Sequence, residues 1–218
     1  MSSLRGLMHV HTHHSFDSLL SPLAYLAYAR RARLDFLCIT DHNTLAGSMA
    51  AARRNRDPGL EVVIGAEYVT DLGDVVGLFL REEVQSRRFA EVVDEIHAQG
   101  GLALLPHPYR GHAVDDALYA AVDLVEVFNA RSSADANAHA RADAERLGTA
   151  QCVGADIHTT WELLRNDTLN ALEGNGELRQ RLLVAPRSFS TRSTSRTLRR
   201  YSQVIKRIRR RVGFPGRA

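Results

Sequence analysis

The sequence predicts an α/β fold whose mostly parallel sheet closes into a distorted barrel, and three observations support this prediction. Short apolar runs with many β-branched residues alternate with helix-like stretches through residues 1–183. Seven such runs are found, a number that suits a closed or distorted barrel. The chain has 218 residues, 44% of them hydrophobic, which is enough to build a sizeable core.

The expected strands are short and apolar, and most end beside histidine, glycine, proline or a carboxylate. They cover Leu7–Val10, Phe36–Thr40, Glu61–Glu67, Val75–Leu80, Leu102–Pro106, Leu124–Phe128 and Gln151–Gly154. Helix-like stretches separate most of them, as the crossover connections of a parallel sheet require.

Four helices are expected between these strands. Ser21 and Pro22 supply a cap and a first-turn proline for a helix that ends near Arg33. The others cover Leu45–Arg56, Ser86–Gln99 and Ser133–Leu147. The last two are followed by glycine, which favours a left-handed helix stop.

The composition excludes several classes of protein. With 44% hydrophobic and 24% charged residues, the chain is neither wholly disordered nor collagen-like. Cys38 and Cys152 lie in apolar runs, which indicates buried thiols in a reducing compartment rather than a disulfide scaffold. No apolar run approaches the roughly 20 residues that span a bilayer, and histidines from His9 onward disfavour a signal peptide. We therefore expect a cytoplasmic protein without a transmembrane segment.

The basic residues are concentrated near the C-terminus. Residues 187–218 hold eleven Lys and Arg and no Asp or Glu, whereas the rest of the chain holds 17 basic and 25 acidic residues. We expect a barrel domain over residues 1–183 and a basic Ser/Thr/Arg-rich segment over residues 184–218. Within that segment, Ser188–Thr197 is expected to be a flexible linker, and Leu198–Val212 has the apolar spacing of an amphipathic helix.

Three roles are open for this basic segment. The first is a solvated tail, and the second is contact with phosphate-rich ligands, either nucleic acid or an anionic substrate. The third is docking on an acidic membrane surface or on the acidic body of a neighbouring subunit. Aromatic residues are few there, so base stacking has little support. The sequence does not indicate the oligomeric state.

Histidines and carboxylates gather at the C-terminal ends of the expected strands, where such folds place their functional sites. His9 and His11 lie two residues apart, so strand alternation points both imidazoles to one face, and Asp156 and His158 repeat this spacing. The full set of candidate metal ligands is His9, His11, Asp17, His42, Glu67, His107, Asp156 and His158. Nitrogen and oxygen donors without cysteine suit Mn²⁺, Fe²⁺ or Zn²⁺ in a hydrolytic site.

Six motifs, in order along the chain, resemble those of the polymerase-and-histidinol-phosphatase (PHP) superfamily of metal-dependent phosphoesterases. They are His9-Val10-His11-Thr12, Ser15-Phe16-Asp17-Ser18, Thr40-Asp41-His42-Asn43-Thr44, Gly65-Ala66-Glu67, Pro106-His107-Pro108 and Gly154-Ala155-Asp156-Ile157-His158-Thr159. Together they cover about Met8 to Glu162. The resemblance implies a distorted seven-stranded β/α barrel that binds two or three divalent ions and hydrolyses phosphate esters.

The resemblance also distributes the donors among the ions. His9, His11, Glu67 and Asp156 would hold one ion, Glu67 and His107 would share a second, and Asp17, His42 and His158 would hold a third. Many family members carry a further histidine in the stretch that matches Gly73–Leu78, where this chain has none. The second ion is thus weakly held, completed by water, or absent, and Asp74 is not expected to reach it.

Three residues near strand ends are candidates for binding the phosphoryl group. Arg110 and Arg131 are placed to fork onto its non-bridging oxygens, and Asn129 to donate a hydrogen bond there. Surface charge or ion pairing is an equally open reading for the two arginines. Water activated by the metal ions would attack phosphorus in line. The acid for the leaving group is left open among His13, His14 and His112.

These observations favour hydrolysis of a phosphate monoester or small phosphodiester, with a nucleotide or short oligonucleotide as the preferred substrate class. Two alternatives are a protein-tyrosine phosphatase of the same family and a non-catalytic, metal-stabilised module that binds nucleic acid. A deep cleft would favour small nucleotides, whereas an open, shallow rim would favour a protein substrate. An amidohydrolase-like reaction is disfavoured, because the only lysine, Lys206, lies outside the expected barrel and cannot supply a bridging carbamate.

Overall fold

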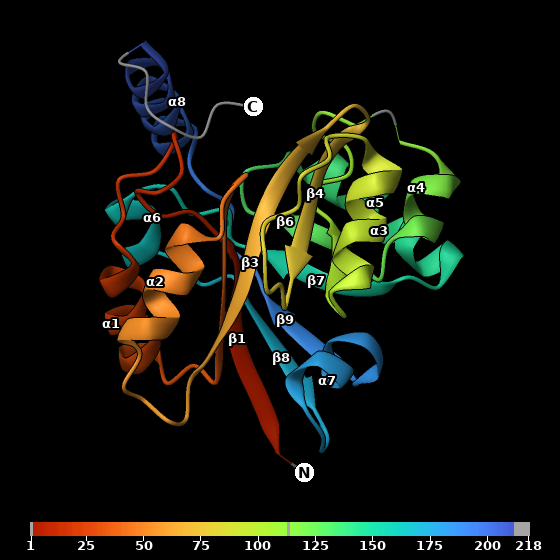
Figure 1. Ribbon diagram of the computed structural model, residues 1–218, viewed down its shortest axis with the longest axis horizontal. Helices are drawn as coiled ribbons and strands as arrows, with labels where there is room; N and C mark the ends of the chain where they lie inside the picture. Colours follow the sequence, from red (N-terminus) through yellow and green to blue (C-terminus); the bar gives the residue numbers. More distant parts are fainter. Residues whose placement is uncertain (1, 113, 212–218) are drawn as a thin grey trace.

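The computed structural model describes residues 2–112 and 114–211, and one nine-stranded sheet runs through this part of the chain (Figure 1). The strands are β1 (Ser3–Val10), β2 (Phe36–His42), β3 (Glu61–Thr70), β4 (Gly73–Leu78), β5 (Leu102–Leu105), β6 (Leu124–Asn129), β7 (Ala150–Gly154), β8 (Leu169–Glu173) and β9 (Arg187–Ser190). The helices are α1 (Pro22–Ala32), α2 (Ala46–Arg54), α3 (Phe89–Ala98), α4 (Asp116–Ala121), α5 (Ala134–Leu147), α6 (Thr160–Leu164), α7 (Leu178–Val184) and α8 (Arg196–Arg211). The sheet order is β7-β6-β5-β4-β3-β2-β1-β8-β9.

The first and seventh strands approach each other, so the sheet curves into a nearly closed barrel. Val10 at the end of β1 forms an isolated parallel bridge with Ile157, just after β7. Backbone hydrogen bonds run from Ala155 N to Met8 O and from His11 N to Ile157 O, both at 3.0 Å. The predicted α/β fold with a distorted seven-stranded barrel is therefore confirmed.

One strand of the barrel runs against its neighbours. β1, β2 and β3 are parallel, as are β5, β6 and β7, but β4 is antiparallel to both β3 and β5. Thr70 at the end of β3 pairs with Gly73 at the start of β4. The first residues of β4 therefore lie at the same end of the barrel as the last residues of β2 and β3.

All seven predicted strands and all four predicted helices of residues 1–183 are present, with ends shifted by a few residues. Ser21 caps α1 by accepting from Ala24 N, and Gly148 ends α5 in the left-handed conformation (φ 71°), as the sequence indicated. The short helices α4, α6 and α7 were not predicted, because elements of 5, 6 or 7 residues show too little periodicity.

Two strands extend the sheet beyond the predicted barrel. β8 pairs antiparallel with β1 from Ser3 to Gly6, and β9 pairs antiparallel with β8. β9 overlaps the beginning of the stretch expected to be a flexible linker, Ser188–Thr197, and α8 overlaps its end, so that expectation is wrong for both ends of the stretch. The predicted basic helix is present as α8, while Val212 and the residues after it lie outside the described part of the chain. The division into two domains at residue 183 stays a prediction.

The interior of the barrel is packed with apolar side chains, to which every strand from β1 to β8 contributes. Cys38 on β2 and Val63 on β3 belong to this cluster, and Cys152 on β7 joins them; both cysteines are buried free thiols. Side chains two or four residues apart on a strand share a face, so His42 and Glu67 follow Cys38 and Val63 on the inward face. The polar end of the barrel therefore rests directly on its apolar core.

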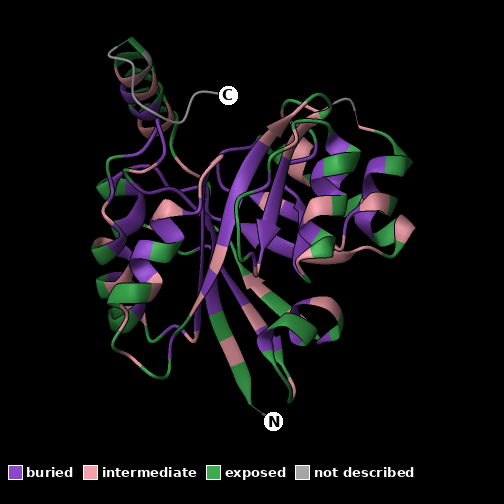
Figure 2. Cartoon of the chain, in the orientation of Figure 1, coloured by how far each residue is buried: buried purple, intermediate pink, exposed green. Residues whose placement is uncertain are grey.

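Helices cover the barrel on two sides, with α1 and α2 on one side and α3, α4 and α5 on the other (Figure 1). The strands are largely buried, and exposed residues lie mainly on the outward faces of the helices (Figure 2). α8 stands at the end of the molecule opposite the N-terminus. Within the described residues, no helix is both long enough and apolar enough to cross a bilayer.

Candidate metal centre

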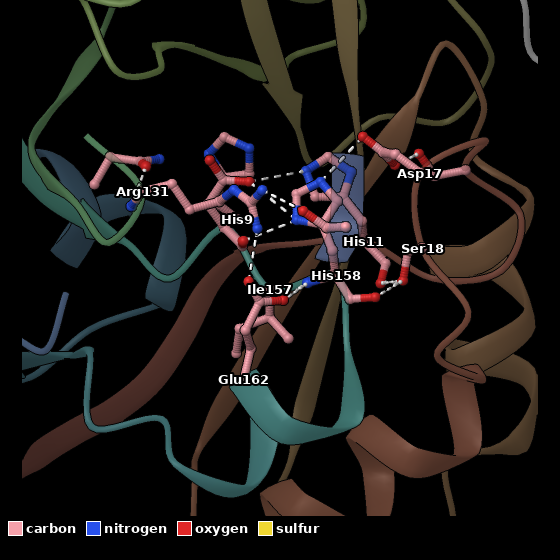
Figure 3. Close-up of polar contacts among 12 residues, drawn as sticks. His9, His11, Asp17, Ser18, Arg131, Ile157, His158 and Glu162 are labelled. Atoms are coloured by element: carbon pink, nitrogen blue, oxygen red, sulfur yellow. Dashed lines mark hydrogen bonds and ion pairs between the residues drawn. The ribbon is translucent and has the colours of Figure 1, made fainter. Parts of the chain in front are cut away.

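The eight candidate metal ligands from the sequence all lie at one end of the barrel, and each is at most 8% exposed. Together with Asp74 they form four overlapping groups, and within each group the donor atoms lie within 4.8 Å of one another. The groups are His11, Asp17, His42 and His158; His9, His11 and Glu67; His9, His107 and Asp156; and Glu67, Asp74 and His107. Figure 3 shows His9, His11 and His158 side by side at this end of the barrel.

Two of the imidazoles are oriented by acceptors behind them. His9 Nδ1–H donates to Glu126 Oε1 at 2.6 Å, which leaves His9 Nε2 facing Glu67 Oε2 at 3.3 Å. His158 Nδ1–H donates to the carbonyl oxygen of Asp156 at 2.9 Å, which leaves His158 Nε2 facing Asp17 Oδ2 at 3.0 Å. An imidazole oriented in this way would present a lone pair on its other nitrogen to a metal ion. Burial disfavours a charged ring, but Glu126 and Glu67 hold the pKa of His9 well above its usual value, so a metal ion would have to displace the proton on Nε2.

Asp17 comes from the loop after β1 and joins two strand ends. Its Oδ2 atom lies 3.0 Å from both His42 Nε2 and His158 Nε2, and Ser15 Oγ donates to its Oδ1 atom at 2.7 Å. The ring of His11 stacks on His158 with centroids 4.4 Å apart. Burial holds the pKa of His11 well below its usual value, so this imidazole is neutral and able to coordinate.

Glu67 is the central carboxylate of the site. It belongs to two of the four donor groups and contacts histidines of the other two. Its Oε2 atom lies 3.3 Å from His9 Nε2, 3.4 Å from His11 Nε2 and 3.3 Å from His42 Nδ1. Its Oε1 atom lies 3.1 Å from His107 Nε2. Burial opposes its ionisation, but His42 and His9 hold the pKa of Glu67 well below its usual value. An ionised carboxylate with both oxygens in use is placed to bridge two ions.

Asp74 reaches the centre, contrary to the expectation from the sequence. Its Oδ2 atom lies 4.0 Å from His107 Nε2, and it joins Glu67 and His107 in one donor group. The expectation treated residue 74 as the beginning of a strand, far from the carboxyl ends. Because β4 is antiparallel, its beginning lies at the same end as Glu67. Asp74 belongs to the stretch in which the resemblance led us to look for a further histidine ligand.

Three of the donors have left-handed backbone conformations, with φ values of 57° at His9, 30° at His107 and 48° at Asp156. His9 also lies in a register shift of β1 between Leu7 and Val10, so regular alternation is not what aims it. Bulges and strained residues of this kind re-aim side chains at functional sites. The predicted convergence of His9 and His11 is present, with ring centroids 5.2 Å apart, but it occurs where β1 departs from regular alternation.

Asp41, in the same motif as His42, holds the loop after β1 rather than joining a donor group. It accepts from Thr12 N at 2.5 Å and from Thr12 Oγ1 at 2.6 Å. Burial raises the pKa of Asp41 to about 7. A Cβ at position 47 would lie 1.8 Å from Asp41 Oδ2, so Gly47 leaves the room that this carboxylate needs.

Glu126 supports the centre from inside β6. Besides accepting from His9, it accepts from His107 N and from Asn129 Nδ2 through Oε2, both at 2.9 Å. A Cβ at Gly154 would lie 1.9 Å from Glu126 Oε1, so glycine at this position makes space for the carboxylate. The signal for this role in the sequence is a carboxylate within an otherwise apolar strand.

Asn129, predicted to contact substrate, is fully buried and occupied by its neighbours. Its Oδ1 atom accepts from Arg110 Nη1 at 3.1 Å and from Arg131 N at 2.9 Å, while its Nδ2 atom donates to Glu126. Asn129 therefore links Glu126 to two arginines, a positioning role.

Both predicted phosphate-binding arginines are paired with carboxylates. Arg110 Nη2 lies 2.5 Å from Asp156 Oδ2, and Arg131 Nη1 lies 2.6 Å from Glu162 Oε1. The remaining end of Arg131, Nη2, donates to Ser202 Oγ on α8 at 2.5 Å. Both side chains nevertheless line the cavity over the donors. The ion pairing that the sequence left open is therefore present for both arginines.

A cavity of about 320 Å³ lies over the donors and has two kinds of wall. Strand-end residues form one wall, and α8 forms the other through Arg199, Gln203 and Lys206. The sequence did not indicate that any of these three lies in the site.

Of the histidines left open as the leaving-group acid, His112 lies beside the centre, with its ring centroid 5.8 Å from that of His107. His13, His14 and His112 are not among the described residues that line the cavity.

The residues present fit a divalent metal centre. Neither ring nitrogen of His11 has a hydrogen-bond partner among the described residues, although the ring is fully buried. A buried polar group without a partner is costly unless something else binds it. Nitrogen and carboxylate donors converge around it in a sulfur-free set, which suits Mn²⁺, Fe²⁺ or Zn²⁺.

The model of the PHP domain family matches residues 8–139 of the chain. Two uncharacterized proteins of Methanocaldococcus jannaschii are similar in sequence. One is 36% identical over 141 residues, 58% of this chain and 82% of that protein. The other is 33% identical over 111 residues, 45% of this chain and 47% of that protein.

Solved structures show the same fold at low sequence identity. A two-domain protein from Bacteroides vulgatus, described as containing a predicted PHP-like metal-dependent phosphoesterase, matches with a TM-score of 0.69 and 18% identity. That match covers 87% of this chain, which spans 65% of the Bacteroides protein. PsfC from Pseudomonas syringae matches with a TM-score of 0.66 and 20% identity, over 97% of this chain and 100% of PsfC.

Proposed function

The chain belongs to the PHP domain family, and from this membership we propose that it is a metal-dependent phosphoesterase. One observation carries the proposal: Glu67 and seven other buried histidines and carboxylates gather at one end of the barrel, beneath a cavity that arginines also line. Such a donor set suits hydrolysis of a phosphate ester, whose reaction requires neutralisation of the phosphoryl oxygens.

The donor groups support two or three ions of Mn²⁺, Fe²⁺ or Zn²⁺. His9, His11 and Glu67 would hold one, with Asp156 added to them by the family resemblance; Glu67, His107 and Asp74 would hold a second; Asp17, His42 and His158, with His11 beside them, would hold a third. When bound, these ions would supply Lewis acidity and activate water for attack on phosphorus. Asp74 would give the second ion a third ligand in place of the histidine that this chain lacks.

The surrounding residues position the reacting groups. Glu126 fixes the ring of His9, and Asn129 fixes Glu126 and Arg110. Arg110 is held by Asp156 through Nη2, and its side chain is 38% exposed toward the cavity. Its remaining N–H groups are available to a phosphoryl oxygen there.

The cavity supports a small substrate. It is bounded by α8 and has a volume of about 320 Å³, within the range of small-molecule sites. This favours a small phosphate monoester or diester, with a nucleotide or short oligonucleotide end as the preferred class, over a phosphotyrosine on a folded protein. The buried free thiols of Cys38 and Cys152 support a cytoplasmic location as part of the same proposal.

The test combines elemental analysis of the purified protein with hydrolysis of 4-nitrophenyl phosphate and bis(4-nitrophenyl) phosphate in added Mn²⁺. We expect two or three metal equivalents and hydrolysis that a chelator abolishes. The ratio of the two rates separates a phosphatase from a nuclease-like enzyme. Absence of both metal and turnover would overturn the proposal. Oligonucleotide binding that survives chelation would then favour the non-catalytic binding module.

A further inference from the structure

α8 is attached to the body of the protein beside the metal centre. Ile205 and Ser202 are 7% and 2% exposed, respectively. Ser202 Oγ accepts from Arg131 Nη2 at 2.5 Å, which ties the helix to the end of β6. Arg209 donates to the carbonyl oxygens of His13 at 3.0 Å and Ser15 at 3.2 Å, and also to that of Ser18. These contacts fix α8 to the loop that carries Asp17.

The helix presents different residues to the cavity and to the outside. Arg199, Gln203 and Lys206 are three or four residues apart, so they lie on one face, and all three line the cavity. On the outer side, Tyr201, Val204 and Ile208 are 51%, 49% and 56% exposed. Arg200 and Arg207 are also exposed.

The positive charges around the cavity are not equivalent. Arg110 and Arg131 are paired with Asp156 and Glu162. Arg199 donates to the carbonyl oxygen of Arg131 at 2.7 Å, and among the described residues neither Arg199 nor Lys206 forms an ion pair with a carboxylate. Two cations that face a cavity without a carboxylate partner are placed to receive an anion from a ligand.

The aromatic ring of Phe16 places Lys206 close to the donors. Lys206 Nζ lies 4.9 Å from the centroid of this ring, and the same ring stacks on that of His42, with centroids 4.8 Å apart and an interplanar angle of 13°. His42 in turn faces Asp17. The ammonium group of Lys206 is therefore separated from His42, a candidate metal-binding residue, by one aromatic ring. A substrate that contacts both Lys206 and the metal centre must be short.

From this arrangement we propose that α8 is the substrate-recognition wall of the site. Arg199 and Lys206 bind a second anionic group of the substrate, distinct from the phosphoryl group that is cleaved. The substrate class is a compact phosphate ester that also carries a phosphate or a carboxylate. This inference rests on the proposed phosphoesterase function and names the substrate chemistry that the function alone leaves open.

The test compares esters that differ only in the second group. The probes are propyl phosphate, propane-1,3-diol bisphosphate and 3-(phosphonooxy)propanoate, and the last two distinguish a phosphate from a carboxylate. We expect at least one doubly anionic ester to have a KM about tenfold lower than that of propyl phosphate, the size of one charge-assisted hydrogen bond. Lys206→Met and Arg199→Met should each remove most of this preference. Lys206→Arg should retain it, as should Arg207→Met, the matched control on the exposed side of α8.

A second readout does not depend on turnover. Lys206 is the only lysine of the chain, so reductive ¹³C-methylation labels one side-chain amine, and the α-amino signal is separable by its different pKa. The Lys206 signal should shift when the preferred doubly anionic ester is added and shift far less with propyl phosphate. Circular dichroism establishes that each variant is folded.

The two proposals fail in different ways. If no ester is hydrolysed under any metal condition, the phosphoesterase proposal falls, and the Lys206 signal still decides whether α8 binds the second anion. If esters are hydrolysed but none of the doubly anionic probes is preferred, the α8 proposal is overturned. A preference that survives in both Lys206→Met and Arg199→Met also overturns it, as does a Lys206 signal that responds equally to all three esters.

Discussion

The two walls of the cavity differ in how their charges are satisfied. On the strand-end wall, almost every charged group is engaged: Glu67 contacts histidines, Asp156 pairs with Arg110, and Glu126 holds His9. On the helix wall, Arg199 and Lys206 face the same space without a carboxylate partner among the described residues. Charged groups that pair with one another hold the strand-end wall in a fixed arrangement. Cations without a carboxylate partner on the helix wall are, by our proposal, the groups that bind an anionic ligand.

The walls therefore differ in what a substitution should do. A change on the strand-end wall leaves a buried charge without its partner and disables the whole centre. A change on the helix wall alters binding or the docking of α8 and leaves the centre intact.

Asp156→Asn should lower kcat/KM by more than 100-fold. Losing a supporting partner of a metal ligand costs about 10–100-fold, and Asp156 both joins a donor group and pairs with Arg110. Steady-state kinetics and metal content measure the effect, and circular dichroism should show the fold retained. Asp167→Asn, at an exposed ion pair with Arg192, is the matched control. Unchanged activity in Asp156→Asn would remove the metal-centre hypothesis.

Glu126→Gln should weaken metal binding by about 10–100-fold, because His9 loses the carboxylate that orients it. Competition with a chelating dye measures the dissociation constant. Glu173→Gln, at an exposed residue of β8, should leave that constant unchanged. Equal affinities in the two variants would show that Glu126 only fills the interior of the barrel.

Metal loading should stabilise the folded protein. Ligand at 100 times its dissociation constant adds about 2.7 kcal/mol to the free energy of unfolding. Thermal unfolding with Mn²⁺ and with chelator measures the difference. Lys206→Met should keep this gain and Asp156→Asn should lose most of it. A gain lost equally in both variants would contradict the contrast between the walls.

Arg209→Met should loosen α8 by about 1–2 kcal/mol, since its guanidinium loses hydrogen bonds to backbone carbonyls of the loop after β1. Amide hydrogen exchange should accelerate in α8 and stay unchanged in β2 and β3. Arg207→Met, on the exposed side of the same helix, should leave both rates unchanged. Faster exchange throughout the barrel would show that α8 is part of the cooperative core.

The strand-end wall was largely predictable from the sequence because most of its donors lie at or just after the end of an apolar run. His42 and Glu67 follow buried strands, and parallel strands bring such residues to one end of a barrel. Asp74 was missed because the sequence pattern does not show that β4 reverses direction. The direction of the His9 side chain was predicted for the wrong reason, since His9 lies in an irregular part of β1 with a left-handed backbone rather than in regular alternation.

The helix wall was not predictable in the same way. The pattern of residues 198–212 predicted a basic amphipathic helix, but an amphipathic pattern does not say which surface the helix covers. That position depends on contacts distant in sequence, such as Ser202 with Arg131 and Arg209 with Ser15. β8 was also missed, because it too depends on a contact distant in sequence. It pairs with Ser3–Gly6, the half of β1 that precedes the predicted strand.

The order of these elements along the chain has a consequence for biosynthesis. Every donor lies between His9 and His158, whereas α8 begins at Arg196. Chains emerge from the ribosome N-terminus first at about 5–20 residues per second, so the donor-bearing strands are made a few seconds before the helix that covers them. The residues of the candidate metal centre are thus all synthesised, and open to ions, before α8 is available to cover them.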